Sequence, residues 1–279
     1  MGNSSDTDFD PGSYWAGLAM HHPVTGLRIF GNGYCETIRK GKRPEGITGK
    51  KEGANVTEFS DRSRKSLART VFATDVTFFS MMTLTYPAVW PRDGKQVKSD
   101  LNRFLTWLRD NYETDYIWWL EFQKRGAPHM HILTTIIYPG TVGHQRFAKA
   151  WCKAQKLEPG VLLWDGRRKL HYNVLDRCER FHRRPKQWEA IRKEGGARRY
   201  ALMYALKPLQ KKVPLQYQNV GRFWACSKGV SKSVTPLGEI ELDDDGLKAW
   251  LEYTQHSAAK MPFTPKNLYA VPQTADLLP

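Results

Sequence analysis

Hydrophobic residues follow two different spacings in the first third of the chain. In "SDRSRKSLARTVFA", Leu67 and Val71 lie four residues apart among basic and polar residues, which predicts an amphipathic helix that begins after Ser60 or Asp61. The stretch "VTFFSMMTLTYP" is instead rich in β-branched and aromatic residues and stops at Pro87. This composition predicts a buried central strand.

Further helices and strands alternate along the rest of the chain. "DLNRFLTWLRDNY" repeats its apolar residues at helical spacing, and "DYIWWLEFQ" and "HMHILTTIIY" read as two strands around the turn "KRGAP". Helices are predicted in "HQRFAKAWCKAQK" and "RYALMYAL", and strands in "LHYNVL" and "GRFWACS". The resulting order, β-α-β-β-α-β-α-β, predicts an α+β fold with a mainly antiparallel β-sheet flanked by helices.

The composition changes at both ends of this pattern. Residues 1–59 are rich in glycine, lysine and turn residues, so we expect a basic N-terminal arm and not a core of its own. Residues 60–235 form the predicted domain. Residues 236–279 contain an acidic turn and a predicted helix, for which capping the domain and contacting a partner are both open roles.

Charge narrows the choice of partner. The 279 residues include 41% hydrophobic residues, enough for a core, and carry a net charge of +15, which indicates nucleic acid or an anionic membrane as partner. No stretch approaches the roughly 20 apolar residues that span a bilayer, and the polar start "MGNSSDTDFD" lacks the layout of a signal peptide. We therefore expect a cytoplasmic protein that binds nucleic acid and no membrane.

The cysteines add no metal or disulfide signature. Cys35, Cys152, Cys178 and Cys226 are widely separated, unlike the cysteines of a zinc knuckle or a dense disulfide framework. We expect reduced thiols with structural roles.

The strand predicted from "HMHILTTIIY" carries two histidines one residue apart. Side chains alternate across a strand, so His129 and His131 share a face. If "YIWWLEFQ" pairs antiparallel with this strand, Glu121 falls near His129 and adds a carboxylate. Nitrogen and oxygen donors of this kind suit Mg²⁺ or Mn²⁺ acting on a phosphate, or zinc acting on a water. Exposed or packed histidines that bind no metal are the alternative.

A second candidate site lies in "RRYALMYALKPLQKK". On a helix, Tyr200, Tyr204 and Lys207 share one stripe, with the tyrosine Cβ atoms about 6 Å apart. A phenol with a pKa of about 10 is a poor nucleophile, but a nearby ammonium group favours the phenolate. The stripe therefore indicates a helix that carries a nucleophile. Aromatic packing in a core is the alternative, and the flanking basic residues favour the nucleophile.

These motifs together resemble the HUH-type rolling-circle replication initiators, in which two histidines flank a bulky hydrophobic residue. "FFSMMTLTYP", "GAPHMHIL" and "YALMYALK" resemble three blocks of that family in the family's order, and "GRFWACSKG" resembles a downstream strand of phage and plasmid members. The resemblance covers roughly residues 60 to 230. The tyrosine spacing is similar to that of the two-tyrosine branch, which includes the gene A proteins of small coliphages, although Met203 stands where many relatives carry a lysine.

The resemblance implies a metal-dependent endonuclease, with a ferredoxin/RRM-like palm, that nicks one strand at a replication origin. Glu121, His129 and His131 would hold Mg²⁺ or Mn²⁺, which polarises the scissile phosphate. A tyrosine would attack phosphorus and form a 5′-phosphotyrosyl link, releasing a 3′-hydroxyl that primes rolling-circle replication. A second transesterification would rejoin the strand.

The resemblance also implies separate roles within the tyrosine stripe. Tyr204 lies three residues before Lys207, as in single-tyrosine initiators, so we expect it to make the first cut. Tyr200 would serve the second transfer. Lys207 would bind the phosphate or stabilise the phenolate.

Basic residues around these motifs are expected to contact the DNA. The predicted DNA-binding residues are Arg125, Arg198, Arg199, Lys211, Lys212, Arg222 and Trp224, the last by stacking on an unpaired base. No G-x-x-x-x-G-K-[ST] phosphate loop occurs, so strand separation would need a host helicase. Single-stranded or supercoiled origin DNA is therefore the expected substrate.

Three other functions remain open on the sequence. An HUH relaxase or transposase would share the metal and tyrosine chemistry. A non-catalytic nucleic-acid-binding protein would use the same histidines and tyrosines only for stacking and packing. A zinc hydrolase would act through a water and form no covalent adduct with DNA.

Overall fold

The computed structural model describes residues 24–31, 34–39, 58–86, 90–157, 161–164, 169–172, 174–191 and 213–259. The chain divides into two compact units, one comprising residues 51–234 and the other residues 1–50 together with 235–279. In the described residues every strand pairing is antiparallel and helices accompany the sheets. The predicted α+β class is confirmed.

The larger unit is built on an antiparallel sheet, here called the central sheet, with the described strand order β8-β3-β5-β4-β9. Its strands are β3 (Ser80–Thr85), β4 (Tyr116–Phe122), β5 (Pro128–Thr134), β8 (Trp188–Ala190) and β9 (Trp224–Cys226). Its helices are α2 (Asp61–Ala73), α3 (Gly94–Asn111), α4 (Gly140–Ala154), α5 (Val174–His182) and α7 (Lys228–Ser233). The remaining elements are the hairpin strands β6 (Val161–Trp164) and β7 (Lys169–Tyr172) and the 3-10 turns Pro185–Gln187 and Leu215–Tyr217.

Capping residues determine where two of the helices begin. The Ser60 hydroxyl accepts a hydrogen bond from the backbone N–H of Ser63 at 3.3 Å, which confirms the predicted start of α2. Helix α3 begins six residues earlier than the apolar repeat suggested. Asp93 caps it by accepting from the Gln96 N–H at 3.1 Å, and its polar first turn hides the helix from a hydrophobic pattern.

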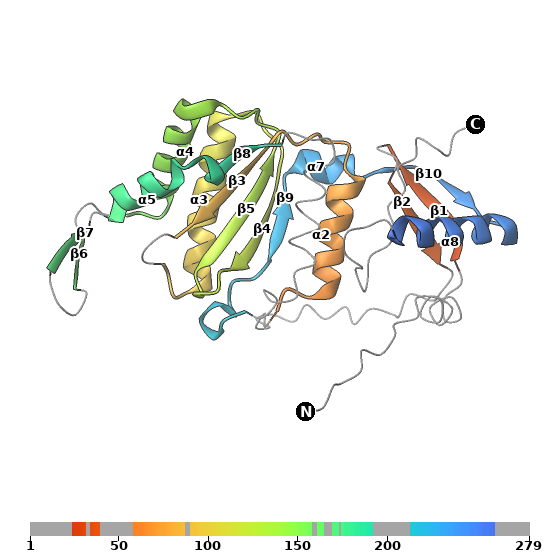
Figure 1. The fold of residues 1–279 in the computed structure, drawn as a ribbon, viewed down its shortest axis with the longest axis horizontal. Helices are drawn as coiled ribbons and strands as arrows, with labels where there is room; N and C mark the ends of the chain where they lie inside the picture. Colours follow the sequence, from red (N-terminus) through yellow and green to blue (C-terminus); the bar gives the residue numbers. More distant parts are fainter. Residues whose placement is uncertain are drawn as a thin grey trace. The chain divides into compact units, whose positions relative to one another are not determined.

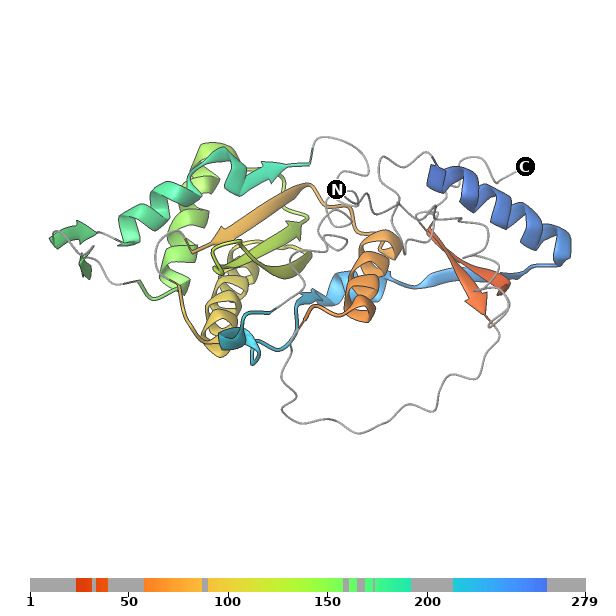
Figure 2. The ribbon, with the colours of Figure 1, turned by 60° about the horizontal axis from the view of Figure 1, so that its bottom comes forward.

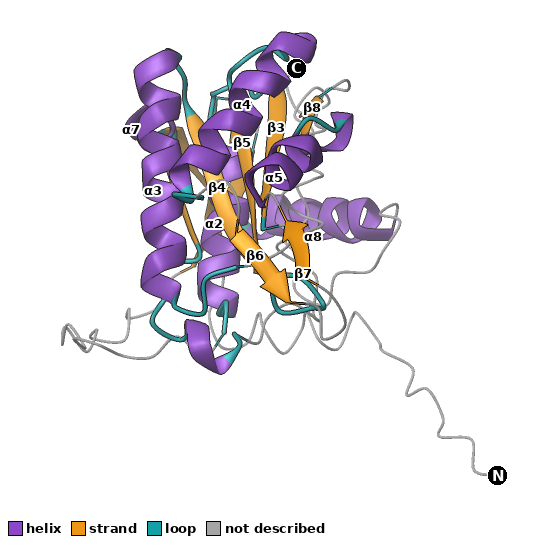
Figure 3. Cartoon of the chain, turned by 90° about the vertical axis from the view of Figure 1, so that its left-hand side faces the viewer, coloured by secondary structure: helices purple, strands orange, loops and turns teal. Residues whose placement is uncertain are grey.

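Helices α3 and α4 pack against one face of the central sheet. Figures 1 and 2 show α3 lying along the strands, and Figure 3 shows α4 and α5 side by side. Phe104 of α3 and Trp151 of α4 meet edge to face with ring centroids 6.0 Å apart, and Met82 and Ile132 are fully buried in the same core. This face is therefore the structural side of the sheet.

The smaller unit joins the two ends of the described chain. Strands β10 (Pro236–Glu241), β1 (Val24–Phe30) and β2 (Cys35–Arg39) form a sheet in that order, here called the small sheet. Leu27 packs with Trp250 of α8 (Asp244–Ala259).

Sequence analysis treated residues 1–59 and 236–279 as separate segments. The pairing of β1 with β10 joins residues more than 200 positions apart, such as Leu27 and Ile240. A local hydrophobic pattern cannot reveal such a pairing, because neither strand buries its apolar face by itself.

The later predicted elements are only partly covered by the described residues. Predicted strands in "LHYNVL" and "GRFWACS" correspond to β7 and β9, whereas the predicted helix "RYALMYAL" lies outside the described residues. Helix α5 and strand β8, which follow β7, were not predicted from the sequence. In the described residues no helix has the length and hydrophobicity to cross a membrane, and all four cysteines are described and are free thiols.

Candidate active site

The register of the central sheet brings the predicted metal ligands together. Antiparallel pairing of β4 with β5 places Glu121 directly opposite His129, as the strand argument required. Cross-strand partners lie on the same face of a sheet and alternate residues do likewise, so Glu121, His129 and His131 all lie on one face. This face is opposite the one that packs Met82 and Ile132 against the helices.

The predicted "KRGAP" turn determines this register. Gly126 adopts φ +80°, a left-handed conformation that glycine tolerates best. Its N–H donates to the Gln123 carbonyl at 2.7 Å, and the Gln123 N–H donates to the Ala127 carbonyl at 2.9 Å. If this turn were one residue longer or shorter and the strand register shifted by one residue, the histidines would move to the other face of the sheet.

The three side chains are close to one another, and those of Glu121 and His131 are shielded from solvent. His131 Nε2 lies 3.7 Å from Glu121 Oε2, and both side chains are buried. The rings of His129 and His131 are 4.6 Å apart between centroids and nearly perpendicular, at 83°. Two imidazoles and a carboxylate are donor types that suit a divalent cation.

A metal at this site is still a prediction. Among the described histidines, cysteines, aspartates and glutamates, no group of three is arranged to hold a metal ion. The 3.7 Å separation between Glu121 and His131 also exceeds the roughly 3 Å between neighbouring donor atoms on an octahedral ion with bonds of about 2.1 Å.

Sequence analysis missed a row of polar side chains that contact the histidines. His129 Nδ1 lies 2.7 Å from Thr85 Oγ1 and 3.3 Å from Gln123 Nε2. His131 Nδ1 lies 3.3 Å from Thr83 Oγ1. The alternation "TLT" in β3 has the same two-residue period as "HMH" in β5, and this shared period is the signal that could have predicted the contact.

Arg125 lies at the edge of this cluster. Its Nε donates to Gln123 Oε1 at 2.8 Å, one of its terminal nitrogens donates to the Tyr86 carbonyl, and its guanidinium stacks on Trp90 at 4.7 Å from the ring centroid. These contacts connect Arg125 to His129 through a single intervening side chain. A contact between Arg125 and a DNA phosphate remains a prediction.

Trp224 lies on β9, the edge strand next to β4, and Arg222 precedes it; Trp224 pairs with Trp119, the cross-strand partner of His131, so it lies on the histidine face. The Trp224 indole donates to Ser63 Oγ at 3.2 Å and its half-buried ring packs against the core, so it has a structural contact beside its predicted stacking role. Arg222 is exposed, and its backbone carbonyl accepts a hydrogen bond from Lys98.

The other predicted site residues lie outside the described part of the chain. They are Tyr200, Tyr204, Lys207, Arg198, Arg199, Lys211 and Lys212. Their roles as nucleophiles, phosphate ligands and DNA contacts stay predictions.

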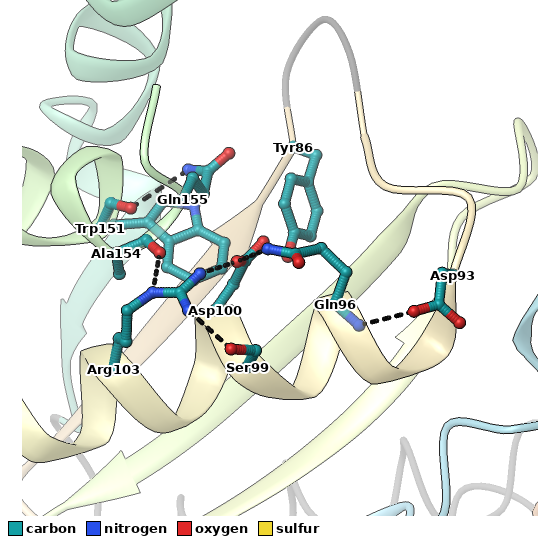
Figure 4. Close-up of polar contacts among 9 residues, drawn as sticks. All are labelled: Tyr86, Asp93, Gln96, Ser99, Asp100, Arg103, Trp151, Ala154 and Gln155. Atoms are coloured by element: carbon teal, nitrogen blue, oxygen red, sulfur yellow. Dashed lines mark hydrogen bonds and ion pairs between the residues drawn. The ribbon is translucent and has the colours of Figure 1, made fainter. Parts of the chain in front are cut away.

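A buried carboxylate anchors the chain where β3 ends. Figure 4 shows the side chains of Tyr86, Gln96 and Arg103 directed toward Asp100 of α3. The Tyr86 hydroxyl donates to Asp100 Oδ2 at 2.8 Å, and Gln96 Nε2 and the Arg103 guanidinium both donate to Oδ1, the former at 2.7 Å. Burial raises the pKa of Asp100, an effect that these hydrogen bonds oppose.

The fold and the histidine face define an α+β protein with a candidate metal-dependent site on its central sheet. Residues 79–213, just under half of the chain, match the sequence model of the family described as "Replication-associated protein ORF2/G2P". The match supports a rolling-circle replication initiator at the level of that family. No curated protein and no solved structure matched the chain.

Proposed function

We propose that this protein is an HUH-type replication initiator that nicks one strand of origin DNA by metal-dependent tyrosine transesterification. One observation carries the proposal: His129, His131 and Glu121 meet on adjacent strands inside a segment that matches a replication-associated family. A buried acid beside two imidazoles is costly for folding, which favours a chemical role over a packing role.

The donor set fits a hard or borderline divalent cation. Glu121 would provide an oxygen ligand, and His129 and His131 nitrogen ligands, to Mg²⁺ or Mn²⁺, with a small closing movement of the Glu121 and His131 side chains. When bound, the ion would polarise the scissile phosphate as a Lewis acid. Three protein ligands would leave coordination positions for phosphate oxygens.

A tyrosine would carry out the covalent step. The Tyr204 phenol oxygen would lose its proton and form a bond to phosphorus, while the bond from phosphorus to the 3′ oxygen breaks and that oxygen takes up a proton. One phosphodiester replaces another, so the strand can be rejoined without ATP. Tyr200 would make the second transfer, and Lys207 would stabilise the phenolate or the phosphate.

The DNA would bind to the basic residues around these groups. We assign phosphate contacts to Arg125, Arg198, Arg199, Lys211, Lys212 and Arg222, and base stacking to Trp224. The substrate would be single-stranded or supercoiled origin DNA in the cytoplasm, with strands separated by a host helicase. Binding dominated by phosphate contacts should weaken steeply as salt rises.

A covalent adduct tests this function directly. The full chain is incubated with Mn²⁺ and a library of random-sequence single-stranded oligonucleotides labelled at the 3′ end, because the 5′-phosphotyrosyl product retains that end. A labelled protein band should survive a denaturing gel, require the metal, and disappear in Tyr200→Phe/Tyr204→Phe. Sequencing the attached DNA would then identify the cleavage site.

Each alternative function gives a different result in this assay. Cleavage with no protein-linked product would indicate a hydrolase that acts through a water. Binding without cleavage, at any metal or DNA sequence tested, would indicate a non-catalytic DNA-binding protein. Adduct formation at a conjugation or transposition site, and none at a replication origin, would indicate a relaxase or transposase.

A further inference from the structure

Two threonines of β3 lie beside the two histidines of β5. The register pairs Thr85 with His129 and Thr83 with His131. The two contacts differ in length, with 2.7 Å between Thr85 Oγ1 and His129 Nδ1 and 3.3 Å between Thr83 Oγ1 and His131 Nδ1. The first is the stronger hydrogen bond, and Thr85 is almost completely buried.

The position of the imidazole proton determines which nitrogen can bind a metal. A neutral histidine carries one proton, so one ring nitrogen donates and the other has the lone pair. If His129 Nδ1 donates to Thr85, the lone pair is on Nε2. If Nδ1 accepts, the proton is on Nε2 and that nitrogen cannot coordinate an ion.

Gln123 favours the second arrangement. Arg125 can only donate hydrogen bonds, and its Nε contacts Gln123 Oε1 at 2.8 Å, so the amide NH₂ of Gln123 must face His129 Nδ1. A donor at 3.3 Å from Nδ1 opposes a proton on that nitrogen. The Thr85 hydroxyl can either donate to Nδ1 or accept from it, so it can accept the proton that Gln123 opposes, and it makes the shorter of the two contacts.

The backbone of Thr85 is held in place by two side chains. In the part of the chain that the structure describes, strand β8 pairs with Ser80–Met82, and Thr85 lies beyond that pairing on the same edge of β3. There, the Thr85 N–H donates to His182 Nε2 at 3.1 Å and the Thr85 carbonyl accepts from the Trp151 indole at 2.9 Å.

The proton of His182 can be assigned from its partners. Its Nδ1 lies 2.8 Å from the Cys178 carbonyl, which can only accept, so Nδ1 carries the proton and Nε2 accepts from Thr85. The Thr85 backbone is therefore fixed by His182 at its N–H and by Trp151 at its carbonyl, and this fixes the position of the hydroxyl beside His129.

We propose that Thr85 is the positioning residue of His129: its hydroxyl accepts the Nδ1 proton and makes Nε2 the metal-binding nitrogen, while Gln123 opposes this state. The inference rests on the proposed metal role of His129. It assigns Thr85 no contact with substrate. Arg125 also influences His129 through Gln123. A DNA phosphate that draws Arg125 away would free Gln123 Oε1 to turn toward His129 Nδ1 and accept its proton.

Metal affinity of the full chain is the first measurement. Mn²⁺ titrations followed by electron paramagnetic resonance, without DNA, should show about 10–100-fold weaker binding in Thr85→Val, a loss typical of removing a hydrogen-bond partner of a metal-ligating histidine. Thr85→Ser should restore most of the affinity. Thr83→Val, the matched control at the longer contact, should lose less, and Gln123→Met should bind Mn²⁺ as tightly as the wild type or more tightly.

The tautomer of His129 is the second measurement, and it does not depend on a metal. In ¹⁵N NMR spectra of the metal-free protein, His129, identified by the signal lost in His129→Gln, should carry its proton on Nδ1, and Thr85→Val should shift it toward Nε2. Equal melting temperatures for wild type and Thr85→Val would exclude a general loss of folding. If Thr85→Val does not fold, Thr85→Ala, which also lacks the hydroxyl, replaces it.

The two measurements separate two kinds of failure. A proton on Nε2 in the wild type, or Mn²⁺ affinity and tautomer both unchanged in Thr85→Val, would overturn the role of Thr85. A wild-type protein that binds no Mn²⁺ while its tautomer still depends on Thr85 would overturn the proposed metal site and leave the positioning role intact.

Discussion

The central and small β-sheets carry ionisable side chains in opposite surroundings. On the small sheet, Arg28 contacts Glu239 at 2.6 Å with side chains 36% and 52% exposed. On the central sheet, Glu121 and His131 lie 3.7 Å apart with side chains only 6% and 3% exposed. Water stabilises the charges of the first pair, whereas the second pair depends on the protein for its stabilisation.

This difference separates a structural arrangement from a candidate functional one. An exposed ion pair contributes about 0–1 kcal/mol and suits an edge strand such as β10. Burying an acid and an imidazole costs more desolvation free energy than their mutual attraction returns. Apolar residues would therefore stabilise the fold more at those positions. The polar face of the central sheet therefore indicates chemistry, and the charges of the small sheet do not.

The largest effect should come from removing a predicted metal ligand. We expect His129→Ala to abolish nicking of single-stranded DNA, because the phosphate would lose its Lewis acid, while DNA binding stays near the wild-type level. Gel assays of nicking and filter binding would measure the two. Glu239→Ala is the matched control and should nick normally. Unchanged nicking in His129→Ala would remove the functional contrast between the two sheets.

A large effect on stability is expected at the buried carboxylate of the larger unit. Asp100→Ala should lower the free energy of unfolding by about 3–5 kcal/mol, because the Arg103 guanidinium and the Tyr86 hydroxyl lose their shared acceptor. Urea denaturation followed by tryptophan fluorescence would measure the loss. A change below about 1 kcal/mol would mean that the network in Figure 4 relaxes easily.

A small effect is expected at the exposed pair of the smaller unit. Glu239→Ala should change the free energy of unfolding by less than about 1 kcal/mol, since water replaces the contact with Arg28 and Glu36 remains 3.9 Å from the same guanidinium. The same denaturation experiment applies. A loss as large as that of Asp100→Ala would show that exposure does not distinguish the two units.

A pH-dependent effect is expected at Lys98. Burial lowers the pKa of Lys98 to about 7, and the nearby Arg222 charge acts in the same direction. The unfolded chain, with a lysine pKa near 10.4, then binds the proton more tightly, so the stability of the wild type should rise from pH 7 to pH 10.

The Lys98→Met variant tests this dependence. It should be more stable relative to the wild type at pH 7 than at pH 10, as read from denaturation midpoints at the two values. The contact of the amine with the Trp118 ring at 3.9 Å favours the charged form and acts against this dependence. A wild-type advantage that grows toward pH 7 would contradict the direction of the pKa shift.

The amino-acid sequence by itself determined the α+β class, the buried strand β3, the start of α2 and the shared face of His129 and His131. These features depend on local spacing: a period of two along a strand, apolar positions four apart on a helix, and a capping hydroxyl. The glycine of the "KRGAP" turn also made the pairing of Glu121 with His129 predictable, since a tight turn determines the register of its strands.

Only the tertiary structure decided which residues surround the histidines and how the chain ends meet. Thr85 is 44 residues from His129, His182 is 97 residues from Thr85, and paired residues of β1 and β10 such as Leu27 and Ile240 are more than 200 positions apart. These contacts arise where strands of different segments become neighbours and where the Thr85 end of β3, beyond its described pairing with β8, bonds to side chains. No local pattern encodes that choice, because it depends on which arrangement buries the most apolar surface while pairing every polar group.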